Sequence, residues 1–562
     1  MKLRSCWGNV LLFVLPPVLF LSATLPNLAL PGIQYDEVYY VPPAAALLKQ
    51  QYDMDYVQID PAVVHLFGRP LPLMFNYYTG FVRAYASLPV FALFGINAAT
   101  IRGSSIAWAT LALMFFIAFT RRLLKSEGVA CAAGIFLALD ASLVAYAHND
   151  FAAVSLMMFF KGAGLWALLR WWQHPQLKRL LYAGAFFFGL GLSDRASFLW
   201  LPMALAPALA LSHGKSCWLE LKRRLQDFRT AGLAAGTFAV GAALFIAFNA
   251  ATLGGTFTPM AGSFRSTSGG ADNLDFFGNL HLRLQMLTEV LGGGYLDQFI
   301  LGDMAYQTSS WHFSGSPLSW LVPLAFFYFA VRALRNRLKH RSSDRALVFL
   351  LVMTAGLLIL TCFTPTLHRG HQLLMLYPFP HILAALLLFE IAAWLRRQWP
   401  RLFQRSEKRL IAAFVVCIGL ASARPVLAYH HLLQQTGGRG VWSNAIYDIV
   451  AEADRHHERT MVCMDWGFNA QLLALTAHPV RTIRNYETTR RSSEQLAQLF
   501  DASHVFLLHA PEYTYVPGAR EDFFAAVHWA GAQIDTLRVF HQREGQPVAY
   551  MVRVKRQGQD AQ

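Results

Sequence analysis

The stretch that decides the fold is "PGIQYDEVYYVPPAAALLKQ", from Pro31 to Gln50. It follows an apolar run over 8–27 that is long enough to cross a membrane as a helix. Two neighbouring acids, Asp36 and Glu37, then stand among tyrosines at the mouth of that helix. A carboxylate at the edge of the hydrocarbon layer is costly unless it is paired, bound to a metal or facing water. The stretch therefore predicts a membrane protein with a polar site where the first helix ends.

The composition of the whole chain agrees with a membrane protein. Of 562 residues, 55% are hydrophobic and only 14% are charged, against about 25% charged residues in an ordinary soluble protein. The formal net charge is +15, which in a soluble protein would suggest a nucleic-acid partner. Here the basic residues fall in short clusters between apolar runs, a pattern typical of membrane topology. We therefore expect a lipid bilayer, and no nucleic acid, as a partner.

About eleven apolar segments are predicted to span the membrane as helices. They lie near 8–27, 98–120, 128–147, 151–170, 180–194, 196–212, 231–250, 317–333, 346–364, 373–394 and 410–428, and 180–212 could instead be one broken hairpin. Every second connection is rich in Lys and Arg, as in "RRLLK", "RWWQHPQLKR" and "KSCWLELKRRLQDFR". The positive-inside rule puts these connections in the cytoplasm, so an odd number of spans leaves residues 429–562 outside. The first run could also be a signal peptide, although it is long and no clear cleavage site follows it.

The predicted fold class is a polytopic α-helical membrane protein with a small extracytoplasmic α/β domain at the C-terminus. The membrane domain covers 1–430 and includes two long outside loops, 28–97 and 251–316. Prolines interrupt the apolar segments of the first loop, so we expect pieces that lie at the membrane interface rather than further spans. The second loop contains "LRLQMLTEVLGGGYLDQF", which predicts a short helix ending at three glycines.

The C-terminal region, 431–562, alternates between two kinds of segment. Strands are predicted for "RTMVCMDWG", "SHVFLLHA", "IDTLRVFHQ" and "AYMVRVKR", and helices for "NAQLLALTA", "SSEQLAQLF" and "REDFFAAVHWAG". Strands that alternate with helices indicate an α/β domain. No Gly-rich nucleotide-binding loop is present in this region, so its expected role is structural support or contact with a partner.

Polar residues gather in the short connections on the outside face. Besides the two acids of the first loop, these are His148, Asn149 and Asp150 after the third span, Asp194 and Arg195 after the fifth, and His368, Arg369 and His371 after the ninth. Each of them alone also fits an ordinary role, such as a solvated helix end or a structural ion pair. Together, on one face, they predict a shared polar cavity. Lys161, inside the fourth span, either needs a partner on another helix or reaches the cytoplasmic half of the membrane.

The order of these motifs resembles the polytopic glycosyltransferases of the GT-C class, and within it the protein O-mannosyltransferase and aminoarabinose-transferase group. The resemblance covers roughly 1–430 and rests mainly on "YDEVYY" and "PLMFNYYTGFVRAYASLPVFALFG". It implies that a sugar passes from a polyprenyl phosphate in the outer leaflet to an acceptor hydroxyl, with inversion. Carried over, Asp36 would be the catalytic base and Glu37 would orient the acceptor or assist a cation.

The other site residues take their expected roles from the lipid-phosphate leaving group. Predicted to bind substrate are Tyr35, Tyr39, Tyr40, Asp150, Arg195, His368, Arg369 and His371. Arginines at the membrane edge suit the charge that builds on phosphate oxygens. His148 and Asp150 could supply nitrogen and oxygen ligands to a divalent metal ion, although two residues in one turn do not make a metal site. No other cofactor is expected.

Two further functions fit parts of the pattern. A transporter or flippase of lipid-linked or small polar substrates would place charges near the middle of the membrane and broken helices in paired halves. A catalytically inactive scaffold would use its C-terminal region to recruit partners. The clustering of acids at one face favours the transferase, with a protein, a glycolipid or a polysaccharide as acceptor. We expect it in a bacterial inner membrane, with the active site and the C-terminal domain on the periplasmic side.

Overall fold

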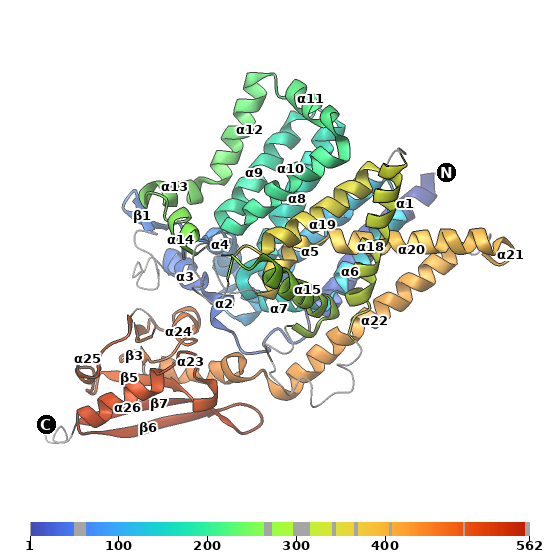
Figure 1. Ribbon diagram of the computed structural model, residues 1–562. Helices are drawn as coiled ribbons and strands as arrows, with labels where there is room; N and C mark the ends of the chain where they lie inside the picture. The colour runs from blue at the N-terminus through green and yellow to red at the C-terminus, as the bar shows by residue number, and fades with distance from the viewer. Residues whose placement is uncertain are drawn as a thin grey trace.

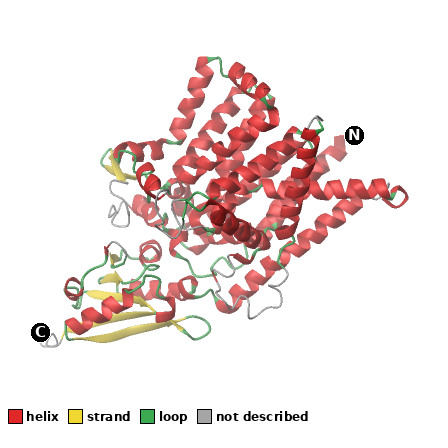
Figure 2. Ribbon diagram, viewed as in Figure 1, coloured by secondary structure: helices red, strands yellow, loops and turns green. Residues whose placement is uncertain are grey.

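The computed structural model describes residues 2–49, 63–263, 272–295, 300, 315–339, 344–364, 369–403, 407–486 and 489–556. Figure 1 and Figure 2 show a large bundle of helices with a small β-sheet packed at one end of it, near the C-terminus. The N-terminal helix lies along one side of the bundle, and the last long helix of the bundle runs out toward the sheet (Figure 1).

A helix lies at each of the predicted spans. These helices are α1 (Lys2–Thr24), α5 (Ala98–Leu124), α6 (Glu127–Ala138), α7 (Ala141–Asn149), α8 (Val154–Gln173), α9 (Lys178–Asp194), α10 (Trp200–His213), α12 (Phe228–Gly241), α13 (Ala243–Ala251), α18 (Leu318–Leu338), α19 (Arg345–Thr361), α20 (Phe379–Gln398) and α22 (Glu407–Thr436). Among the described residues, 5 helical segments are long and apolar enough to cross a membrane, or up to 7 if each bent pair is one span. The chain is thus a multi-pass membrane protein, and the number eleven stays a prediction.

The bend between α6 and α7 has a polar cause. The two helices meet at 57°, and Asp140 at the break accepts a hydrogen bond from the backbone nitrogen of Leu143 at 2.8 Å. This contact caps α7 and competes with continuation of α6. The same carboxylate accepts a hydrogen bond from the Tyr377 hydroxyl at 3.1 Å and contacts His381 Nε2 at 3.0 Å. Asp140 therefore fixes the direction of α7, the helix that leads into Asp150.

The two long loops are folded over one end of the bundle. The first contains α2 (Tyr35–Val38), α3 (Val41–Lys49), the hairpin β1 (Val63–Leu66) and β2 (Arg69–Pro72), and α4 (Val82–Phe94). The second contains α14 (Phe257–Ser263) and α15 (Phe276–Gly292). The predicted helix before the three glycines is confirmed, because α15 ends at Gly293 with φ 89°, a backbone conformation that favours glycine.

The C-terminal region forms a five-stranded sheet. Its strands are β3 (Thr460–Cys463), β4 (Arg481–Arg484), β5 (His504–His509), β6 (Ala532–His541) and β7 (Pro547–Arg556), in the order β4-β3-β5-β7-β6. β3 is parallel to β4 and β5, whereas β7 is antiparallel to β5 and β6. The four strands and three helices predicted here are present, the helices being α24 (Asn469–Leu475), α25 (Ser493–Ala497) and α26 (Ala519–Trp529). β4 and α23 (Ala445–Arg455) were not predicted.

The C-terminal region packs directly against the first loop. The Tyr35 and Trp466 rings lie 4.9 Å apart between centroids, and the Tyr447 hydroxyl donates a hydrogen bond to the Ala29 carbonyl at 3.0 Å. The predicted boundary at 430 falls inside α22, which continues to Thr436. Whether 431–562 is an independent domain stays a prediction, but these contacts hold it over the start of the loop that carries the two acids.

Candidate active site

The acids of the first loop lie on the single helical turn α2. Its start is fixed by Gln34, whose side chain accepts a hydrogen bond from the backbone nitrogen of Asp36 at 2.7 Å. The Glu37 carboxylate in turn accepts one from the backbone nitrogen of Gln34 at 3.3 Å, which completes a capping box. Neighbouring side chains on a helix point about 100° apart. The two acids therefore face different surroundings.

Glu37 points into the bundle and is fully buried. Its two carboxylate oxygens bind Arg102 of α5, at 2.5 Å from Nε and 2.9 Å from Nη2. The Arg102 Nη1 donates to the Leu28 carbonyl at 2.9 Å. A charge buried at this depth costs several kcal/mol unless it has such a partner. Glu37 thus ties the first loop to α5.

Asp36 is the acid that keeps access to solvent. Its side chain is partly exposed, and no described residue donates a hydrogen bond to its carboxylate. Burial raises the pKa of Asp36 to about 6, while Arg369 and Arg195 act in the opposite direction. A carboxylate with this pKa is ionised at pH 7 and is a stronger base than an ordinary Asp. Asp36 thus lies near enough to both predicted arginines, Arg195 and Arg369, for their charges to act on its pKa.

Asp150 is buried in a network of its own. Its Oδ2 accepts hydrogen bonds from Arg83 Nη2 at 2.7 Å, from Arg83 Nε at 3.0 Å and from the Tyr40 hydroxyl at 2.9 Å. Arg83 also donates to Ser104 Oγ at 3.0 Å. The Asp150 backbone has φ 48°, a left-handed conformation that Asp tolerates better than most residues. Asp150 therefore joins the turn after α7 to Arg83 of α4 and to Tyr40 of the first loop.

The turn that carries Asp194 and Arg195 is held by the first loop. The backbone nitrogen of Gly80 donates to the Asp194 carbonyl at 2.9 Å, and the Tyr78 carbonyl accepts from the residue after Arg195 at 2.9 Å. A Cβ at Gly80 would lie 1.8 Å from a backbone oxygen of α9, so only glycine allows this close approach. The first loop thereby brings Arg195 toward Asp36.

Arg369 precedes a 3₁₀ segment, η4 (Gly370–Leu376), that is held from two sides. Arg283 of α15 donates to the Thr361 carbonyl at 2.9 Å and to the Arg369 carbonyl at 3.2 Å, and it also binds the Gln372 side chain. From the bundle, Lys161 donates to the Met375 carbonyl at 3.0 Å. Lys161 was predicted to need a partner outside its own helix or to reach the cytoplasmic half of the membrane. The Leu374 and Met375 carbonyls of η4 are such partners.

Of the two histidines predicted in this connection, His371 is described by the structure and His368 is not. Burial and Arg195 lower the pKa of His371 well below its usual value, so its ring is neutral at pH 7. Its Nδ1 lacks a hydrogen-bond partner among the described residues, and its ring lies 6.2 Å from that of Phe151. His371 can therefore bind a further polar group. His368 lies outside the described residues.

The three tyrosines around the acids are buried and serve different contacts. Tyr35 packs on Trp466, as described above, and Tyr39 packs on Phe75 with 4.7 Å between ring centroids. Tyr40 donates its hydroxyl hydrogen bond to Asp150. Burial raises the pKa of Tyr39, and the charges of Arg195 and, more weakly, of Asp36 act on it as well. Of the three, Tyr39 therefore has the clearest position beside the candidate base.

The residues predicted to bind a metal do not form a ligand set. His148 Nδ1 contacts the Thr24 carbonyl at 2.8 Å and Nε2 contacts the Leu30 carbonyl at 2.7 Å, so both ring nitrogens are engaged. Asp150 is paired with Arg83. Within the described part of the chain, no three His, Cys, Asp or Glu side chains lie close enough to hold a metal ion.

Sequence reasoning missed the buried arginines of the site. Arg83 and Arg102 hold Asp150 and Glu37, and Arg283 holds the Arg369 connection. The signal was present for two of them, because Arg102 is a charge within an apolar span and Arg83 lies in the motif "GFVRAYA". A cation in such a place requires a buried partner. Arg283 gave no comparable signal.

The chain is similar to known proteins in its fold rather than in its sequence. No family model matches the chain, and no curated protein matches its sequence. Its structure is similar to that of ArnT from Cupriavidus metallidurans bound to undecaprenyl phosphate, with a TM-score of 0.61, 12% identity, and coverage of 97% of this chain and 98% of that one. It is also similar to the archaeal oligosaccharyltransferase AglB from Archaeoglobus fulgidus in complex with an inhibitory peptide and a dolichol-phosphate. For AglB the TM-score is 0.51, the identity is 13%, and 91% of this chain and 70% of that one are covered.

Both of these proteins are glycosyltransferases of the GT-C fold. The chain therefore has the GT-C fold, the class that its motifs resemble, and the similarity extends beyond residue 430 into the C-terminal region.

Proposed function

We propose that this protein transfers a sugar from a polyprenyl-phosphate donor to an acceptor hydroxyl, with Asp36 as the general base. The observation that carries the proposal is Asp36 itself, a partly exposed carboxylate of raised pKa beside Arg195 and Arg369. The similar structures, which hold undecaprenyl phosphate and a dolichol-phosphate, support a lipid phosphate as the donor class.

In the proposed reaction, Asp36 accepts the proton of the acceptor hydroxyl while that oxygen attacks the anomeric carbon. The bond between the anomeric carbon and the phosphate oxygen breaks on the opposite side, so the configuration inverts. A positioned general base contributes about 10²–10⁴-fold to the rate in typical enzymes. The charge that develops on the leaving phosphate is stabilised by Arg195 and Arg369. The neutral His371 ring donates a further hydrogen bond to it.

Glu37 and Asp150 act as positioning residues in this scheme. Glu37 holds α2 through Arg102, which keeps Asp36 on the partly exposed side of that turn. Asp150 binds both Tyr40 and Arg83. Because Tyr40 is the neighbour of Tyr39 in the sequence, these bonds also hold Tyr39 in place near Asp36. Both acids are fully buried and paired, so neither is available to accept a proton from an acceptor. The sugar is expected against Tyr39.

We further assign the site to the extracytoplasmic face of a bacterial inner membrane, together with residues 431–562. The basis is the distribution of Lys and Arg, which gather in the connections at the other end of the bundle. The acceptor is a hydroxyl of a protein, a glycolipid or a polysaccharide.

The test is transfer in proteoliposomes with a panel of radiolabelled polyprenyl-phosphate sugars and extracted envelope acceptors. Wild type should label an acceptor, and the anomeric configuration of the product should be the inverse of that of the donor. Asp36→Asn should lose almost all transfer. Movement of the intact labelled lipid across the membrane without cleavage would contradict the proposal and favour a flippase.

A further inference from the structure

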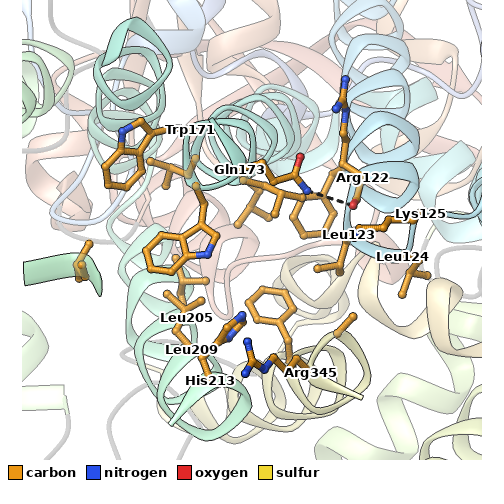
Figure 3. A pocket seen from close by; sticks show the side chains of 18 of the residues that line it. Arg122, Leu123, Leu124, Lys125, Trp171, Gln173, Leu205, Leu209, His213 and Arg345 are labelled. Atoms are coloured by element: carbon orange, nitrogen blue, oxygen red, sulfur yellow. Dashed lines mark hydrogen bonds between the residues drawn. The ribbon is translucent and has the colours of Figure 1, made fainter. Parts of the chain in front are cut away.

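A second site lies at the end of the bundle opposite to Asp36. It is a cavity of about 630 Å³ bounded by the last turns of α5 and α8, by α10, by α11 (Lys215–Arg224) and by the start of α19 (Figure 3). α8 begins beside the Asp150 turn and has 20 residues, so its two ends are about 30 Å apart at 1.5 Å per residue. The cavity is therefore separate from the candidate active site.

The interior of this cavity is apolar. Leucines from α5, α8, α10 and α11 line it, together with Phe119, Trp171, Trp172 and Phe349. Its volume falls in the range of about 300–1,000 Å³ that is usual for small-molecule pockets, and such pockets are mostly apolar with a few polar groups. The lining thus suits a hydrocarbon chain.

The rim of the cavity is basic. Arg122, Lys125 and Arg345 line it and are exposed (Figure 3), and none of the three has an ion-pair partner among the described residues. The acid on the lining, Asp344, caps α19 by accepting a hydrogen bond from the Ala346 backbone nitrogen at 2.9 Å. The rim therefore carries a net positive charge directly above an apolar space.

α11 indicates the depth at which the cavity lies. The helix exposes Trp218 and Leu219, which are 70% and 65% accessible, close in sequence to Lys222 and Arg223. Exposed aromatic and apolar side chains beside basic ones are typical of a helix that lies in the plane of the membrane interface. Leu221 of the same helix lines the cavity. The basic rim thus lies at the level of lipid headgroups.

We propose that this cavity binds an anionic membrane lipid, with its hydrocarbon chain in the apolar interior and its phosphate at the basic rim to which Arg122, Lys125 and Arg345 contribute. Each cation near a membrane surface contributes about 1 kcal/mol toward an anionic lipid, or about fivefold in affinity. The inference does not rest on the proposed sugar transfer, because the residues and the end of the bundle are different.

The experiment measures lipid retention by the purified full chain, after reconstitution with phosphatidylglycerol and phosphatidylcholine of the same acyl chains. Native mass spectrometry counts the lipids that remain bound. Wild type should retain phosphatidylglycerol in clear preference to phosphatidylcholine. The double variant Arg122→Gln/Arg345→Gln should lower phosphatidylglycerol retention by about fivefold for each arginine removed.

Two further variants make the result specific. Arg335→Gln/Arg337→Gln removes the same charge from α18 at the same end of the bundle, but these residues do not line the cavity, so retention should equal wild type. Leu209→Trp fills the interior and should lower retention as well. Equal retention by the two double variants would overturn the proposal, as would equal retention of the two lipids by wild type. Displacement of the lipid by soluble glycerol phosphate at matched concentration would show that the site recognises phosphate alone.

Discussion

At the Asp36 end of the bundle the acids Glu37 and Asp150 are buried and paired, whereas three cations at the rim of the opposite cavity, Arg122, Lys125 and Arg345, are exposed and have no ion-pair partner among the described residues. Glu37 and Asp150 each have an arginine within 2.7 Å, while Arg122 and Arg345 have none among the described residues. A buried charge must be held by partners from the chain itself, and it then has little left to offer a ligand. A charge that the chain leaves unpaired is available for binding or chemistry.

The same contrast occurs within one turn of α2. Glu37 is fully buried and bidentate with Arg102, and Asp36, its neighbour, is partly exposed with a raised pKa. Two acids that look alike in the sequence thus have separate tasks, because the helical turn directs Glu37 into the bundle and leaves Asp36 partly exposed. The predictions below test whether these tasks can be separated by substitution.

The largest effect on stability is expected at Glu37. Glu37→Gln leaves the Arg102 guanidinium buried without a counter-charge, which should lower the free energy of unfolding by about 3–5 kcal/mol. Thermal unfolding of the detergent-solubilised protein measures it. The control is Glu37→Gln/Arg102→Met, which removes both charges and should recover most of the loss. A single variant as stable as wild type would show that the pair does not hold the loop.

A smaller effect is expected at Asp150. Asp150→Asn also leaves a buried arginine without its counter-charge, but only one oxygen of Asp150 binds Arg83 and Tyr40 and the amide keeps such an oxygen, so we expect a loss of about 3 kcal/mol in stability, at the lower end for a broken buried ion pair. Asp150→Ala should cost more, because it removes the acceptor and also places Ala at φ 48°. Unfolding of both variants under the same conditions measures the difference. The interpretation fails if Ala is tolerated as well as Asn.

The pH dependence of transfer distinguishes Asp36 from an ordinary acid. Its carboxylate must be deprotonated to accept a proton, and its pKa is raised to about 6. The rate should therefore be level above about pH 6 and fall roughly tenfold for each unit below it. The residual activity of Asp36→Asn should lack this fall. A wild-type rate that declines only near pH 4 would mean that the pKa of Asp36 is not raised, or that Asp36 is not the base.

How well a feature of this protein could be predicted from the sequence depends on how far apart along the chain its residues lie. The spans were predictable because each needs only one long apolar run, and the meeting of Asp36 with Arg195 and Arg369 followed from placing all three on one face. The pairs Glu37–Arg102 and Asp150–Arg83 were not, because their partners are 65 and 67 residues apart. Nothing local specifies which buried cation meets which acid. The bends within spans, such as the one at Asp140, depend on tertiary partners in the same way.

The measurement that tests the central claim most directly is the transfer rate of Asp36→Asn beside that of Glu37→Gln/Arg102→Met, in the same proteoliposomes and at matched protein amounts. The account predicts that Asp36→Asn loses about 10²–10⁴-fold, while the double variant, folded and without either buried charge, retains a rate within about tenfold of wild type. If Asp36→Asn transfers sugar as fast as wild type while the double variant does not, the base is not Asp36 and the assignment of the two acids is reversed.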